Sequence, residues 1–105
     1  MDKIAKIQYS YLHGAVDLFN AGTNDYYGSL SPKDGSTGAF ANHFNYKVVL
    51  HAEDKKPIKI IAAWYWGCYN FENTDESLIT TKEFEPSEKG AADAVSWLQS
   101  EYDRT

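Results

Sequence analysis

Cysteine is almost absent from this chain of 105 residues, which contains only Cys68. A single cysteine excludes an internal disulfide framework and a zinc site built from several cysteines. In an apolar stretch such as that around Cys68, a free cysteine usually behaves as a small hydrophobic residue. The first residues lack the apolar segment of a secretory signal, and no stretch approaches the roughly 18 apolar residues of a membrane span. We therefore expect a cytoplasmic protein without a membrane segment.

Basic residues are scarce in the last third of the chain. The net charge is −5, and residues 72–105 hold nine acids against three basic residues. A nucleic-acid binder normally shows the opposite bias, because contacts with phosphates supply most of its nonspecific affinity. The charge pattern therefore disfavours nucleic acid as a partner, although a one-sided acidic surface can also imitate nucleic-acid phosphates.

The motifs of the common catalytic and cofactor sites are missing as well. The sequence has no GxxxxGK[ST], GxGxxG or GxSxG pattern. The histidines His13, His43 and His51 show no HxH or HxxxH spacing, and a metal site needs several converging ligands. A thiol–imidazole pair of Cys68 with His51 is compatible with neighbouring strands, but nothing in the sequence requires it. We expect no catalytic residue, no metal and no cofactor.

The chain does have the hydrophobic content of a globular domain, at 43%. Residues 2–20 are expected to form a helix, because their apolar residues recur at spacings of three and four. The first residues also alternate between apolar and polar side chains, as in a short strand, but this alternation covers fewer positions than the helical spacing does. A second helix is expected over residues 88–103, with Ser87 as its N-cap.

Three strands are expected between the two helices. Residues 44–52 alternate between apolar and polar, residues 58–71 are apolar on both faces, and residues 78–84 are amphipathic. The middle segment is therefore expected at the centre of the sheet and the last one at an edge. The turn-rich residues 22–43 are expected to be a long loop that either hides a short strand near Tyr26–Leu30 or is a functional segment.

The resulting order α-β-β-β-α resembles that of the double-stranded RNA-binding domain. That family reads RNA through basic residues at the start of its second helix, in a KKxAK-like pattern. The corresponding stretch here, from Ser87 to Asp93, has two acids and one lysine. We use the resemblance for the fold and not for the activity. The predicted fold is one α+β domain over residues 1–105, with a three-stranded antiparallel meander and two helices on one face.

Aromatic residues make up 15% of the chain, and some of them are expected at the surface. With both helices on one face, the other sheet face is open, and alternation alone does not decide which aromatic row of residues 58–71 it carries. Exposed aromatic rings can anchor a protein partner, and neighbouring acids can attract a basic one. We predict a non-catalytic protein-binding or regulatory module whose contact residues are Tyr65, Tyr69, Trp64, Trp66, Lys47, His51, Glu72, Asp75 and Glu76.

Several alternatives remain open at this point. A small enzyme or small-molecule binder would have a pocket near His43 and His51, under the long loop. A nucleic-acid binder would stack bases on the aromatic face. A homodimer would bury the same rings or pair sheet edges. Aromatic residues are also natural in a central strand, so their packing needs no function to explain it.

Overall fold

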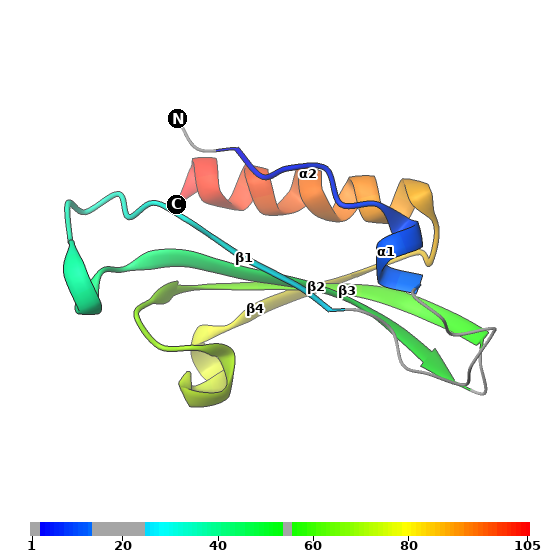
Figure 1. Cartoon of the computed structure of the whole chain (residues 1–105), viewed down its shortest axis with the longest axis horizontal. Helices are drawn as coiled ribbons and strands as arrows, with labels where there is room; N and C mark the ends of the chain where they lie inside the picture. Colours follow the sequence, from blue (N-terminus) through cyan, green and yellow to red (C-terminus); the bar gives the residue numbers. More distant parts are fainter. Residues whose placement is uncertain (1–2, 14–24, 54–55) are drawn as a thin grey trace.

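The computed structural model describes residues 3–13, 25–53 and 56–105. A four-stranded antiparallel sheet carries a long helix and the N-terminal segment on one face (Figure 1). The strands follow one another across the sheet in chain order, as a meander. They are β1 (Tyr26–Leu30), β2 (His43–Glu53), β3 (Lys56–Gly67) and β4 (Thr80–Phe84).

The α+β class is confirmed, with one strand more than the predicted meander. The additional strand, β1, is the short strand that was one of the two alternatives for residues 22–43. It pairs with β2 so that Gly28 lies opposite Tyr46. A Cβ atom on Gly28 would come within 2.4 Å of the Tyr46 ring, so glycine lets the two strands pair around that ring.

The first helix is shorter than predicted. Helix α1 spans Tyr9–His13, and residues 3–8 have no regular secondary structure. Ile4 and Ile7 are nevertheless buried, and the backbone amide of Ile4 donates to Oε1 of Gln99 at 2.8 Å. The apolar spacing thus identified side chains that are buried, but an irregular segment tied to the long helix buries them. The predicted helical residues 14–20 lie outside the described residues.

The long helix α2 (Glu88–Arg104) agrees closely with the prediction for residues 88–103. The Ser87 hydroxyl oxygen accepts from the backbone amide of Gly90 at 3.0 Å, which confirms the predicted N-cap. Among the described helices, neither is long and apolar enough to cross a membrane. The buried face of α2 consists of Gly90, Ala91, Ala94, Leu98 and Tyr102. Its small residues let the first half of the helix approach the sheet closely.

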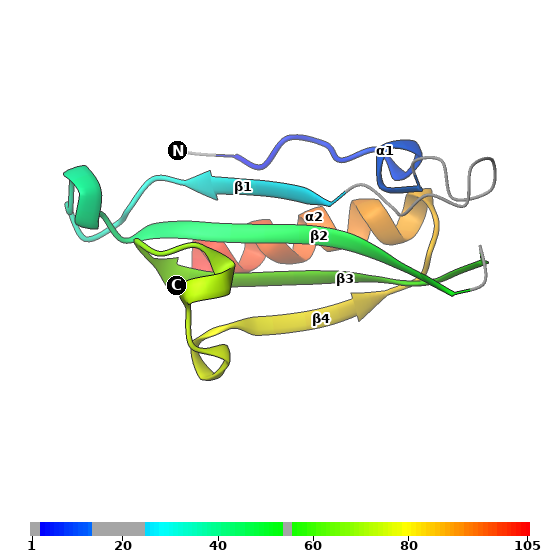
Figure 2. The same ribbon diagram turned by 60° about the horizontal axis from the view of Figure 1, so that its bottom comes forward.

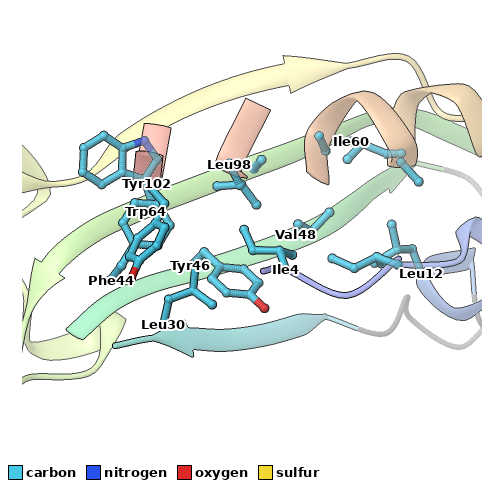
Figure 3. Close-up of a cluster of buried hydrophobic side chains, with 14 of the residues drawn as sticks. Ile4, Leu12, Leu30, Phe44, Tyr46, Val48, Ile60, Trp64, Leu98 and Tyr102 are labelled. Atoms are coloured by element: carbon cyan, nitrogen blue, oxygen red, sulfur yellow. The ribbon is translucent and has the colours of Figure 1, made fainter. Parts of the chain in front are cut away.

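The hydrophobic core lies between α2, the N-terminal segment and one sheet face (Figure 3). Phe44 is fully buried at one end of this core. Its ring centroid lies 5.1 Å from that of Trp64, 5.3 Å from that of Trp66 and 5.2 Å from that of Tyr102. Trp64 and Trp66 of β3 therefore face α2. This contact decides which face of β3 packs against the helix, a question that the alternation of residues left open.

The segment that joins β3 to β4 is longer than predicted, because β3 ends at Gly67 rather than at residue 71. Two short 3-10 helices follow, η2 (Phe71–Asn73) and η3 (Glu76–Leu78). We call residues 68–79 the β3–β4 connection. Figure 2 shows this connection turning at one end of the sheet, beside the ends of β2 and β3.

Candidate functional site

Neither described α-helix covers the sheet face opposite α2 (Figure 1). Strand alternation brings Lys47, Asn45 and Tyr65 to this open face, because their neighbours Tyr46 and Trp64 belong to the core. Asn45 pairs with Tyr65 across β2 and β3. The open face therefore carries Tyr65, whereas Trp64 and Trp66 lie on the other face of β3.

The β3–β4 connection folds back over part of the open face. The Phe71 ring meets the Tyr65 ring edge-on, with 4.7 Å between centroids. The Tyr27 ring lies 6.0 Å from the Phe71 ring, and Nζ of Lys47 lies 4.7 Å from its centroid. The hydroxyl of Tyr65 donates to the backbone oxygen of Tyr69. Phe71 thus packs against side chains from three strands.

Local hydrogen bonds fix the conformation of the connection. Oδ1 of Asn70 accepts from the backbone amide of Asn73 at 3.0 Å, and Oδ1 of Asp75 accepts from that of Ser77 at 3.0 Å. The bonds from Ser77 favour the carboxylate, so they lower the pKa of Asp75. Each of the two 3-10 helices therefore begins at a capping side chain, and Phe71 is held inward.

A groove of about 350 Å³ lies between β1 and the connection. Burial raises the pKa of Tyr27, and the nearby carboxylates of Asp25 and Glu72 raise it further. The Tyr27 side chain forms one wall of the groove, and its hydroxyl donates to Oδ2 of Asp25 at 3.5 Å. The groove is lined by, among others, Tyr27, Ser29, Asn45, Tyr65, Phe71 and Glu72.

Three of the predicted contact residues are covered rather than available. Trp64 is buried in the core, and Trp66 is half-buried against Phe44 on the same side. Tyr65 does lie on the open face, but Phe71 leaves it only 1% exposed. The prediction that either row supplies exposed rings on β3 is wrong. Trp64 and Trp66 lie on the face that packs against α2, and Tyr65 is covered because the connection folds over the sheet, which alternation cannot reveal.

The predicted residues of the connection are exposed. Tyr69 is 61% exposed, and Glu72, Asp75 and Glu76 all have exposed side chains. Of these acids, Asp75 caps η3, so its carboxylate already has a structural role. Sequence reasoning missed Leu78, which it placed inside a strand and which is 63% exposed.

Lys47 and His51 lie apart from one another along β2. Lys47 packs on Phe71, whereas His51 pairs with Lys59 toward the opposite end of the sheet and contacts Oε1 of Glu53 at 3.2 Å. The structure therefore joins Lys47 to the connection and separates His51 from it.

The structure does not bring His43 and His51 together into a site. Cys68 follows the end of β3 that pairs with His43, whereas His51 lies eight residues further along β2, about 26 Å at the usual rise of a strand. A Cys68–His51 pair is therefore excluded. Three pockets on the described residues, with volumes of about 350, 340 and 300 Å³, are lined by neither His43 nor His51. Within the described part of the chain, no group of three or more potential metal ligands comes together.

Comparison with protein-family models, with curated proteins and with solved structures gives no match for this chain. No family, relative or structural neighbour therefore contributes to the functional argument. The proposal below is supported by the geometry of the β3–β4 connection and of the sheet face beneath it.

Replacing Phe71 by alanine tests whether the connection is anchored on the open face. We expect Phe71→Ala to lower the free energy of unfolding by about 1 to 3 kcal/mol, since the ring is half-buried rather than fully buried. Urea unfolding measures this change. Nitration of Tyr65, followed by peptide mass spectrometry, should become several times faster because its ring loses its cover.

The matched control is Phe40→Ala, which removes the same side chain from another 3-10 helix, η1 (Gly38–Phe40). Phe40 is 76% exposed, so we expect a change within about 0.5 kcal/mol and no change in Tyr65 nitration. Equal effects of the two substitutions would show that Phe71 does not anchor the connection.

Proposed function

We propose that this chain is a non-catalytic protein-binding module that docks its partner on the β3–β4 connection. The observation that carries the proposal is the exposure of Tyr69 and Leu78, at 61% and 63%, on a connection held by its own caps. We call Tyr69, Glu72, Glu76 and Leu78 the docking surface. Tyrosine is enriched among the few residues that supply most of the binding energy of an interface, and Leu78 adds apolar area that a partner can cover.

The fixed conformation of the connection favours binding. A loop that is ordered only on binding lowers the affinity through lost conformational entropy. Here the caps at Asn70 and Asp75 and the contact of Phe71 with Tyr65 order the connection before a partner arrives. The docking surface is thus presented in one arrangement, as a recognition site requires.

The charge of the docking surface indicates the chemistry of the partner. Glu72 and Glu76 are exposed, and residues 72–105 as a whole are strongly acidic. Complementary charge steers association and selects among partners. We infer a partner with a basic surface around an apolar centre, and we expect its association rate to fall as salt is added.

The experiment compares partner capture by three forms of the chain in lysate of the cells that encode it. Tyr69→Ser combined with Leu78→Ser removes both exposed apolar side chains of the docking surface. Because both side chains are exposed, we expect stability to change by less than about 1 kcal/mol. We expect a protein captured by the wild-type chain to be lost with the double variant, as measured by quantitative mass spectrometry.

The control is Ile58→Ser, which removes a 46% exposed apolar side chain at the opposite end of β3. This variant should capture the same protein as the wild-type chain. If the protein captured is a second copy of the chain, the docking surface is a homodimer interface and the proposed partner is wrong. The proposal would also be contradicted if the double variant captured the same proteins as the wild-type chain. It would be contradicted as well if Ile58→Ser lost the captured protein to the same extent.

A further inference from the structure

The groove between β1 and the connection has aromatic walls and an acidic side. The Tyr27 and Phe71 rings meet at an angle of 64°, and the Tyr65 ring lies edge-on to Phe71. Glu72 follows Phe71 in the chain, lines the same groove and is exposed. Aromatic surface that ends at a carboxylate suits a side chain with an apolar stem and a cationic head.

Hydrogen-bond acceptors lie in the same groove. Nδ2 of Asn45 donates to the backbone oxygens of His43 at 3.1 Å and of Gly67 at 3.0 Å, which turns its Oδ1 away from both. The hydroxyl of Ser29 is exposed beside it. Together with the carboxylate of Glu72, these groups provide several acceptors for one ligand. A guanidinium presents five N–H donors in a planar fork and stacks on aromatic rings, so it fits this set better than an ammonium does.

The nearby charges favour a cation. The carboxylates of Asp25 and Glu72 both act on the hydroxyl of Tyr27, and Asp25 also approaches it at 3.5 Å. The ammonium of Lys47 stacks on Phe71, but no basic residue is among the described residues that line the groove. The charged side chain in the groove lining is the carboxylate of Glu72, with Asp25 close to Tyr27, and this arrangement attracts positive charge.

The size of the groove limits what enters it. Its volume of about 350 Å³ is near the lower end of the range for small-molecule sites, roughly 300 to 1,000 Å³, and is sufficient for one side chain. Glu72 belongs both to this groove and to the docking surface. We propose that the groove receives an arginine side chain of the partner that docks on the connection, an inference that rests on the proposed function.

The test uses the peptide acetyl-Gly-Arg-Gly-amide and its citrulline analogue, which has the same shape without the charge. Both are titrated into the full chain and followed by NMR. The arginine peptide should cause saturable shifts at the backbone amides of Ser29, Asn45 and Phe71, with a millimolar dissociation constant that rises with salt. The citrulline peptide should bind about tenfold more weakly, because it lacks the charge-assisted hydrogen bonds.

Two single-charge variants provide the matched comparison. Glu72→Gln should weaken binding of the arginine peptide about threefold to fivefold, the upper part of the range for an exposed ion pair. Glu76→Gln removes the same charge from the same connection without altering the groove lining, and binding should stay unchanged. Equal binding of the two peptides, equal effects of the two variants, or no saturable shift at the groove amides would each overturn the proposal.

These outcomes are separate from a failure of the proposed function. If the arginine peptide fails to bind while the Tyr69 and Leu78 variant still loses its partner, the docking surface stands and the arginine pocket is wrong. If the peptide binds at the groove while the Tyr69 and Leu78 variant still captures the partner, the groove is a cation site and the docking surface is wrong.

Discussion

Phe44→Ala is expected to lower the free energy of unfolding by about 3 to 5 kcal/mol, the largest effect of any substitution considered. Phe44 is fully buried, and its ring contacts those of Trp64, Trp66 and Tyr102. Alanine would leave a cavity among these rigid rings, which cannot close around it. A domain of this size has about 5 to 15 kcal/mol of stability in total, so one ring accounts for a large fraction.

Urea unfolding monitored by tryptophan fluorescence measures this loss, because two of the three tryptophans touch Phe44. If the alanine variant does not fold, Phe44→Leu gives the answer with an expected loss of about 1 to 2 kcal/mol. A loss no greater than that of Phe40→Ala would contradict the position of Phe44 at the centre of the ring cluster.

Gly90→Ala is expected to destabilise the protein by about 3 kcal/mol, although alanine is the better helix former. By propensity alone, this change inside α2 would stabilise the helix by about 1 kcal/mol. A Cβ atom on Gly90 would lie 1.7 Å from the backbone oxygen of Glu85, which also accepts from the amide of Ser87. Relief of this clash would require the chain before the helix to move, so the steric cost exceeds the gain in propensity.

The control for this prediction is Ala92→Gly, at an exposed position in the same part of α2. It should cost about 1 kcal/mol, the ordinary difference in propensity between the two residues. Thermal and urea unfolding of the two variants give the sign directly. A Gly90→Ala protein that is more stable than the wild type would show that the chain before α2 does not pass close to Gly90.

The sequence predicted α2 and β2 most closely. For α2, the apolar spacing and the N-cap at Ser87 indicate the same start, and the structure confirms both. For β2, alternation extends over the whole strand. For residues 2–20 the apolar spacing also predicted a helix, but an irregular segment buries Ile4 and Ile7 instead. The burial of a side chain and the conformation of its backbone are separate properties. The periodicity of apolar residues indicates burial more directly than it indicates conformation.

The candidate site was only partly predictable. Alternation gave two rows on β3, and the choice between them depended on the packing of Phe44 against α2, which is a long-range contact. The connection was harder, because it folds over the sheet through the caps of Asn70 and Asp75 and through Phe71. These residues have no period, so their pattern resembled the end of one strand and an ordinary polar turn. The exposed acids could be predicted because the sequence alone shows where acidic residues are concentrated.

Photocrosslinking in the source cells tests the docking surface most directly. A photoreactive p-benzoylphenylalanine would replace Tyr69 on the connection or, as a control, the exposed Ser96 on α2. From position 69 we expect one discrete adduct with a basic protein, and we expect it to disappear when Glu72→Lys and Glu76→Lys are added. Position 96 should not give that adduct. The same adduct from both positions, or one that survives the charge reversal, would contradict binding through the β3–β4 connection.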